Sequence, residues 1–175
     1  MAIPFILMLL FAKEPPDREK QTIGSHLKVL TEKDAWVFNI SYILTFGGYI
    51  GMTTFLPTFF HDQYGIPKEQ MGQYSAIIVV MASISRIAGG FLADRFGGLR
   101  VMWFVATIVI TTTLIAATLP PVILVTIILI VLFLALGAGN GATFQLVPLR
   151  FPGNTAVAMS LIGEIGALGG GIIPN

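Results

Sequence analysis

The sequence has no cysteine and little charge. Its 175 residues include ten Lys or Arg and nine Asp or Glu, so that 11% of the chain is charged, whereas soluble domains carry about 25%. Without cysteine, the chain can form neither disulfides nor thiolate metal sites. Because 55% of the residues are hydrophobic, too few charged groups remain to cover a water-facing surface. The composition therefore indicates a membrane protein.

The sequence also lacks the motifs of common enzymes and nucleic-acid-binding proteins. No HExxH, GxSxG or phosphate-binding loop occurs, and these patterns are the ones that place a metal ligand, a nucleophile or a phosphate cradle. The two histidines, His26 and His61, fall in loops or at the edge of an apolar stretch. The net charge is +1, with no basic run. We therefore expect no enzyme activity, no cofactor, no metal site and no nucleic-acid partner.

Long apolar stretches dominate what is present. A helix needs about 20 mostly apolar residues to cross a membrane. Four stretches bounded by turn or charged residues meet this requirement, namely 36–60, 70–93, 99–119 and 122–147. A fifth, 155–175, reaches the last residue of the sequence. Residues 1–12 are apolar but too short and lack the positive leader of a signal peptide, so we expect them to be the end of a truncated transmembrane helix.

The positions of the basic residues predict the orientation in the membrane. Eight of them lie in alternate loops: Lys13, Arg18, Lys20, Lys28, Lys33, Arg95, Arg100 and Arg150. By the positive-inside rule these loops are cytoplasmic, and the opposite set of loops holds only Lys68. The segment 13–35 is then a cytoplasmic linker. Its later part, SHLKVLTEKDAW, is either a short helix lying along the membrane interface or a solvated connector.

Arg86 is the one basic residue inside a predicted span. A guanidinium in hydrocarbon is costly, so it needs a partner, a water-filled cavity or a route to the headgroups. The residues at three- and four-residue spacing from it are all small: Ala82, Ser83, Gly89 and Gly90. Such stripes face protein more often than lipid, and the planar fork of arginine suits flat oxyanions such as carboxylate or nitrate. Alternatively, Arg86 leans toward the cytoplasmic headgroups near Asp94, roughly 12 Å along the helix.

Glu164 is the only acidic residue inside a predicted span. Its helical neighbours include Ser160, Ala167 and Gly171, again small residues. A buried carboxyl can load and release a proton, which would suit proton coupling. The alternative is a carboxyl hydrogen-bonded to a neighbouring helix or paired with a cation elsewhere.

Aromatic residues and glycines gather on the first full span. Tyr42 and Phe46 stand one helical turn apart, and Gly47, Gly48 and Gly51 follow closely. Aromatic residues on a membrane helix more often face lipid or pack against protein. The glycines favour close helix packing on this face, which leaves a cavity lining open as a second interpretation.

Two further glycine clusters have the GxxxG spacing that lets helix backbones approach closely. Gly137 and Gly141 lie in GAGNGATF on the fourth span, and Gly166 and Gly170 lie in GEIGALGGG on the last. Asn140 and Gln145 accompany the first cluster. Residues of this kind more often hydrogen-bond between helices than bind a substrate.

The loop that follows the second full span resembles a known family motif. The residues GFLADRFGG, from Gly90 to Gly98, resemble the G-x-L-x-D-R-x-G loop of the major facilitator superfamily. The resemblance implies that Gly90, Asp94 and Arg95 help to latch a cytoplasmic gate.

Three segments together carry a more specific resemblance. ISYILTFGGYIGM, SRIAGGFLADRFGG and AMSLIGEIGALGGGIIP are similar to the second half of the nitrate/nitrite porter family. The resemblance implies an all-α membrane protein, namely the C-terminal half of a major-facilitator-type helix bundle from the end of helix six through helix eleven. Residues 36–175 would then be the C-terminal transmembrane bundle, truncated before its last helix. Residues 13–35 would link it to a missing N-terminal half of the same transporter.

The same resemblance implies a site. Arg86 corresponds to the arginine that this half gives to the central anion site, and Tyr42 and Phe46 correspond to the aromatic positions that line it. The glycine signature of the last span is matched by Gly163, Gly166, Gly169 and Gly170. Glu164 departs from the family pattern, in which a small or apolar residue stands there, and so favours proton symport over anion exchange.

We therefore expect a secondary active transporter of nitrate, nitrite or both, embedded in the lipid bilayer of a bacterial cytoplasmic (inner) membrane and inactive as this piece alone. A major facilitator carrier for another small anion or organic solute is the nearest alternative. A non-transporting membrane helix bundle is the alternative from another class, and an intramembrane enzyme has no residues to support it.

Overall fold

The computed structural model describes residues 10–11 and 23–172. Most of segment 1–12 and the first part of the linker therefore lie outside the described residues. The described part contains helices and no strand, which confirms the all-α fold. Its elements are α2 (Ile23–Thr31), α3 (Lys33–Tyr42), the π-helix η1 (Ile43–Gly47), α4 (Gly48–Tyr64), α5 (Lys68–Phe96), α6 (Gly98–Ala116), α7 (Val122–Arg150) and α8 (Thr155–Ile172).

Among the described residues, five helical segments are long and apolar enough to cross a membrane, as the hydropathy predicts. The first is continuous through α3, η1 and α4, from Lys33 to Tyr64. It begins a few residues before the start that we expected from apolar residues alone. Asp34 lies in the first turn of α3, where a carboxylate is favourable near the positive end of the helix dipole, so the charged residues can belong to the helix.

Glycine and proline set the ends of these helices. Gly65 caps α4 with φ +65°, a left-handed conformation that costs glycine nothing. Gly97 ends α5 with φ +89°, within the loop motif. Pro67 and Pro121 stand immediately before α5 and α7, where a missing N–H removes no helical hydrogen bond.

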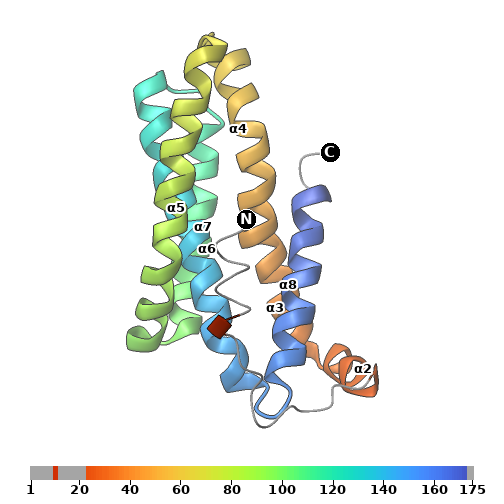
Figure 1. Cartoon of the computed structure of the whole chain (residues 1–175). Helices are drawn as coiled ribbons and strands as arrows, with labels where there is room; N and C mark the ends of the chain where they lie inside the picture. The colour runs from red at the N-terminus through yellow and green to blue at the C-terminus, as the bar shows by residue number, and fades with distance from the viewer. Residues whose placement is uncertain (1–9, 12–22, 173–175) are drawn as a thin grey trace.

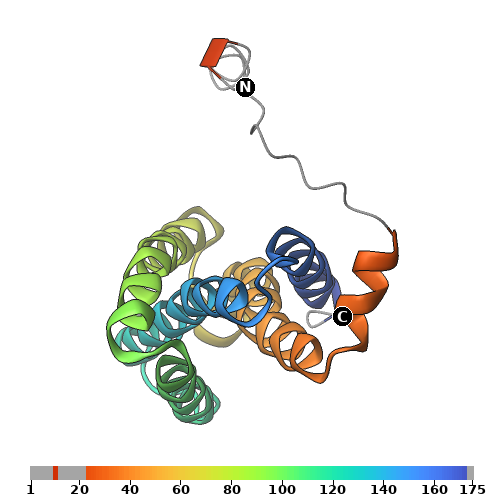
Figure 2. The same ribbon diagram turned by 90° about the horizontal axis from the view of Figure 1, so that it is seen from below.

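The spans run alternately up and down (Figure 1). The α5–α6 and α7–α8 connections lie at the same end as α2, and the α4–α5 and α6–α7 connections lie at the opposite end (Figure 1). This arrangement matches the two sets of loops inferred from the basic residues. Figures 1 and 2 also show α2 at the outer edge of its end of the bundle, where it packs against α3 and α8. It is a helix with Val29 fully buried, so the later part of the linker is not a solvated connector.

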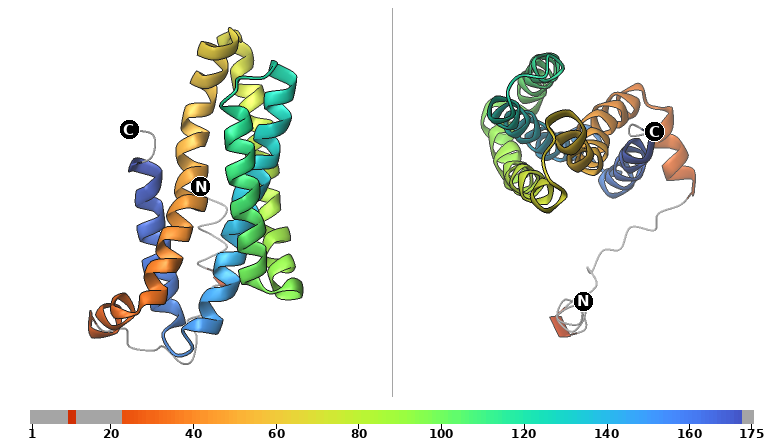
Figure 3. Two further views of the ribbon diagram at one scale, coloured as in Figure 1. Left: turned by 180° about the vertical axis from the view of Figure 1, so that it is seen from behind. Right: turned by 90° about the horizontal axis from the view of Figure 1, so that it is seen from above.

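Viewed along the spans, the helices form two groups that meet at α7 and α4 (Figure 2). In one group α7 packs against α5 and α6, and in the other α8 packs against α3, η1 and α4. The view from the opposite end shows the same division (Figure 3). The candidate site residues on the first span therefore lie between α7 and α8.

Both GxxxG pairs mediate close helix contacts, as expected. A Cβ added to Gly137 would collide with Ser85 and Ala82 of α5, and one added to Gly141 would collide with the carbonyl oxygen of Arg86. On α8, Gly166 and Gly170 lie against the first span. The contacts of Gly137 and Gly141 fix the position of α5 along the axis of α7, and with it the position of Arg86.

Candidate functional site

The guanidinium of Arg86 lies over two aromatic rings. Its Cζ atom is 5.2 Å from the ring centroid of Phe46 and 5.0 Å from that of Tyr49. Both distances are within the range of a cation–π interaction. Both rings belong to the middle of the Lys33–Tyr64 span, so the charge stays inside the apolar region and does not reach toward the end near Asp94.

No carboxylate balances this charge within the described ranges. The ion pairs found there all belong to Arg150. The side chain of Arg86 is half-buried, and its Nε atom is buried without a hydrogen-bond partner among the described residues. The structure thus places a positive group with unused donors against an apolar, aromatic wall.

Three aromatic side chains form this wall along one face of the first span. The rings of Tyr42 and Phe46 are stacked, 5.0 Å apart at an interplanar angle of 11°, and Tyr49 follows at the next turn. The sequence analysis singled out Tyr42 and Phe46 but missed Tyr49. Its position, three residues after Phe46 and seven after Tyr42, is the helical repeat that could have identified it.

The π-helix η1 directly follows Tyr42 and contains Phe46. Its five residues, Ile43–Gly47, adopt the wider helix, a rare form that is frequent at functional sites. Nothing in the apolar pattern predicted it. The consecutive glycines Gly47 and Gly48 were the local signal, because they allow both the irregular backbone and its close neighbours.

Helix α7 supplies the second side of the site. Phe144 meets Tyr42 edge-on with ring centroids 5.0 Å apart, and Phe133 meets Tyr49 in the same way at 5.8 Å. The two phenylalanines therefore contact the two ends of the aromatic wall. Phe133 thus packs directly against one of the two rings beneath Arg86, that of Tyr49, and Phe144 packs against Tyr42, which stacks on the other.

The glycines of α8 support the wall from behind. Gly166 lies directly against the Tyr42 ring, and a Cβ on Gly169 or Gly170 would lie 2.8 Å from the side chain of Ile43 or Ile50. Gly163 has nothing within 4 Å of its Cβ direction. The structure thus brings three of the four signature glycines to the first span as packing residues, and a direct substrate contact stays a prediction for all four.

Glu164 lies apart from the aromatic wall. It stands two residues before Gly166, which turns it about 200° around α8 from the face that touches Tyr42. Its side chain is exposed and accepts a hydrogen bond from Ser160 Oγ at 2.9 Å. The neighbouring Ser160 was anticipated from the helical spacing, whereas proton coupling stays a prediction.

The residues of the loop motif lie at the end of α5. Asp94 and Arg95 are exposed, and the Arg95 guanidinium lies 5.5 Å from the centroid of the Phe96 ring. Neither forms an ion pair with another described residue. A Cβ on Gly90 would make an ordinary contact of 3.9 Å with Gly141. The latch role of these residues stays a prediction.

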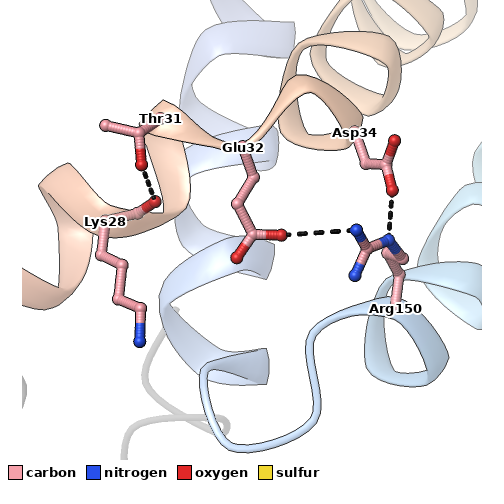
Figure 4. A network of polar contacts seen from close by, with 5 residues as sticks. All are labelled: Lys28, Thr31, Glu32, Asp34 and Arg150. Atoms are coloured by element: carbon pink, nitrogen blue, oxygen red, sulfur yellow. Dashed lines mark hydrogen bonds and ion pairs between the residues drawn. The ribbon is translucent and has the colours of Figure 1, made fainter.

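A charge cluster that the sequence analysis did not identify joins α3 to α7. Arg150, at the end of α7, donates to Asp34 through Nε, and its Nη2 is 3.6 Å from Glu32 Oε2 (Figure 4). Asp34 and Glu32 stand at the start of the first span. All three side chains are partly exposed, and pairs of this kind contribute about 0–1 kcal/mol. The cluster fixes the relative position of two helix ends and adds little stability.

The chemistry available here is electrostatic. In the part of the chain that the structure describes, no three His, Cys, Asp or Glu side chains are close enough to hold a metal ion. The arginine carries a fixed positive charge and a planar set of donors. A small anion with oxygen acceptors is the ligand that such a group suits best.

Five antiparallel apolar helices define an integral membrane protein of the helical-bundle class. The model of the Major Facilitator Superfamily matches residues 1–174. The chain belongs to the Major Facilitator Superfamily. This assignment confirms the family expected from the loop motif and the fold class expected from the whole sequence.

Curated relatives confirm the more specific resemblance. The "Nitrite extrusion protein" of Bacillus subtilis (strain 168) is 28% identical over 171 residues, which cover 97% of this chain and 43% of that protein. The "Probable nitrate/nitrite antiporter NarK1" of Thermus thermophilus is 27% identical over 167 residues, covering 85% and 38%. The "Probable nitrate transporter NarT" of Staphylococcus haemolyticus (strain JCSC1435) is 29% identical over 171 residues, covering 97% and 44%. The chain thus spans about two fifths of the length of these relatives.

Proposed function

We propose that the complete protein that carries this sequence is a secondary active transporter of nitrate, nitrite or both. It works by alternating access in a bacterial cytoplasmic membrane and transforms nothing chemically. The superfamily assignment and the names of the relatives support a transporter over an enzyme. Anions would bind near the membrane midplane, between this part and an N-terminal half, as in other transporters built from repeats.

The observation that carries this proposal is the charge of Arg86 held on the rings of Phe46 and Tyr49. A charged side chain near the bilayer centre costs about 2.5–3.5 kcal/mol on insertion scales. A carboxylate partner would reduce that cost but would also neutralise the site. The aromatic rings stabilise the cation through their negative faces and leave its donors to a mobile anion, which they also restrict to a small, flat shape.

The other site residues have supporting roles in this proposal. Gly166, Gly169 and Gly170 let α8 slide or bend against the first span as the site changes access. Asp94, Arg95 and Gly90 latch the cytoplasmic gate. Glu164 couples anion movement to a proton. Arg86 is the one arginine inside a predicted span here and supplies half of the anion site, so residues 1–175 alone would not transport.

Competition for uptake tests the proposal against its rivals. The complete protein is reconstituted in liposomes, and uptake of isotope-labelled nitrate and nitrite is measured with an excess of unlabelled nitrate, nitrite, a monocarboxylate or a hexose. We expect competition from nitrate and nitrite only. Inhibition by the monocarboxylate or the hexose, without inhibition by nitrate, would indicate a carrier for another solute. Uptake no faster than into protein-free liposomes would indicate a non-transporting bundle.

A further inference from the structure

Asn140 is a buried polar residue that the proposed site has not yet used. It lies on α7 with 2% of its surface exposed. Neither its Nδ2 nor its Oδ1 atom has a hydrogen-bond partner among the described residues. Buried amides without partners are rare because burial removes their bonds to water, so an unpaired one inside a transporter points to a ligand.

The helical repeat shows which way Asn140 faces. Phe133, Gly137, Asn140 and Phe144 follow one another at spacings of four, three and four residues, which keeps them on one face of α7. Phe133 contacts Tyr49, and Phe144 contacts Tyr42. Asn140 therefore lies between the two ends of the aromatic wall, at the level where Arg86 covers Phe46.

The contacts of the two glycines that flank Asn140 indicate the same direction for its side chain. Gly139 faces Thr45 of η1 and Val105 of α6, and Gly141 faces the backbone of Arg86 on α5. The residue between them points into the wedge between the first span and α5. That wedge contains the Arg86 side chain, whose Nε is also buried and unpartnered in the described ranges.

Two other buried amides share this lack of partners but lie elsewhere. Asn39 precedes Phe46 by seven residues on the first span, about 10 Å along the helix axis. The Oε1 atom of Gln145 lies beside the start of α6, where it would be 2.8 Å from a Cβ on Gly98. Of the three, Asn140 is the one whose neighbour in the chain, Gly141, lies against the backbone of Arg86.

We propose that Asn140 is a second ligand of the transported anion and that it favours nitrate over nitrite. This inference rests on the proposed function. The arginine fork can take two oxygens of either anion, but nitrate has a third oxygen where nitrite has a lone pair on nitrogen. The Nδ2 group of Asn140 donates a hydrogen bond to that third oxygen. Arg86 Nε and Asn140 Nδ2 are both unpartnered donors in the described part of the chain, and oxygen acceptors on the ligand would satisfy them.

Transport kinetics of the complete protein in liposomes test this inference. KM and maximal rate are measured for nitrate and nitrite with wild type, Asn140→Ala and the matched control Asn39→Ala, which removes an equally buried, unpartnered amide away from the arginine. We expect Asn140→Ala to raise the nitrate KM about tenfold or more, as loss of a bond to a charged ligand does. The nitrite KM should change much less, the maximal rates should stay near wild type, and Asn39→Ala should change neither KM.

Asn140→Ser keeps a donor and guards against an alanine variant that fails to fold. We expect its nitrate KM to fall between those of wild type and Asn140→Ala. Equal changes for both anions, or equal effects of the Asn39 and Asn140 variants, would overturn the inference and make Asn140 a packing residue. If wild type moves neither anion, the proposed function itself fails, which is a different result from normal transport with an unchanged nitrate KM in the Asn140 variants.

Discussion

At the scale of single residues, Arg86 depends on aromatic rings for its place in the membrane. The rings of Phe46 and Tyr49 lie 5.2 and 5.0 Å from its Cζ. A ring stabilises a cation without bearing a net charge, so the site remains positive overall. An arginine paired with a carboxylate would only anchor its helix, whereas an arginine that lies on neutral rings remains available to an anion.

Replacing the ring of Phe46 tests that difference. Phe46→Leu keeps an apolar side chain but removes one of the two rings beneath Arg86, and a cation–π contact is worth about 0.5–2 kcal/mol. We expect the KM for nitrate or nitrite uptake to rise by roughly twofold to thirtyfold, the corresponding range. The matched control is Phe55→Leu, because Phe55 is exposed and its ring is paired with Phe59, away from the arginine. An equal response to both variants would contradict the aromatic support of Arg86.

Much of this site could be predicted from residue types. A lone arginine in an apolar span singled out Arg86, and the family resemblance added Tyr42 and Phe46 to the predicted site. The structure places Arg86 over Phe46, which stacks on Tyr42. Tyr49 continues the helical repeat of Tyr42 and Phe46, but Asn140 could not be assigned in this way, because its significance depends on which helix it faces. That information comes from packing between α5, α7 and the first span, which spacing within one helix does not contain.

Glu164 offers a test of coupling at the same scale. Glu164→Gln keeps the size of the side chain but cannot exchange a proton, so uptake driven by a pH gradient should be lost while exchange of anions at equal pH continues. Ser160→Ala is the control, since it removes the hydrogen bond to Glu164 and leaves the carboxyl in place. Unchanged uptake by the glutamine variant at every pH would rule out this carboxyl as the coupling group.

At the scale of elements, close backbone contact joins the first span to α8. Gly47 of η1 meets the backbone of Gly169, and Gly166 meets the Tyr42 ring. Helices in lipid associate through packing of this kind, because lipid tails are as apolar as leucine side chains. The glycines therefore determine how the aromatic wall stands relative to α8.

A pair of alanine substitutions tests this packing. On Gly47, a Cβ would lie 2.8 Å from the backbone carbon of Gly169, whereas on Gly163 it would meet nothing within 4 Å. Overpacking typically costs about 1–3 kcal/mol. We expect Gly47→Ala to lower the melting temperature of the detergent-solubilised complete protein by several degrees and Gly163→Ala to leave it unchanged or higher. The opposite order would show that η1 and α8 are not in contact at these positions.

The positions of the spans were predictable, because long apolar runs bounded by glycine, proline or charge leave few alternatives. The π-helix η1 was not. It lies where Gly47 meets Gly169 of α8 and Gly48 meets Leu136 of α7, and contacts between helices have no counterpart in the hydropathy. The apolar pattern also did not predict that the first span starts at Lys33. Its first turn is charged, and Asp34 and the preceding Glu32 form ion pairs with Arg150 of α7.

At the scale of the whole molecule, the distribution of basic residues and the fold give the same orientation. The loops after α5 and α7 lie at the end of the bundle that holds α2 (Figure 1), and these are the basic loops. The connections at Gly65 and Pro120 lie at the other end. The protein should therefore expose α2 and the α7–α8 loop to the cytoplasm.

Labelling of single cysteines tests this orientation. Because residues 1–175 contain no cysteine, one introduced thiol is the only target that this sequence offers. In intact cells, a membrane-impermeant maleimide should label Asp62→Cys and Thr118→Cys but not Pro152→Cys, and all three positions are exposed. In inverted vesicles the pattern should reverse. Labelling of Pro152→Cys from outside would invert the assigned orientation.

The account as a whole depends on Arg86 as the ligand of an oxyanion. The most direct measurement is nitrate and nitrite uptake into liposomes that contain the complete protein, compared between wild type and Arg86→Lys. Lysine keeps the positive charge but loses the planar fork. We predict that wild type takes up the anions and that the lysine variant does so at least about tenfold less efficiently, in line with the loss of a bidentate charged bond. Equal uptake by the two proteins would contradict the account, because Arg86 would then be a structural residue and the substrate would have to bind elsewhere.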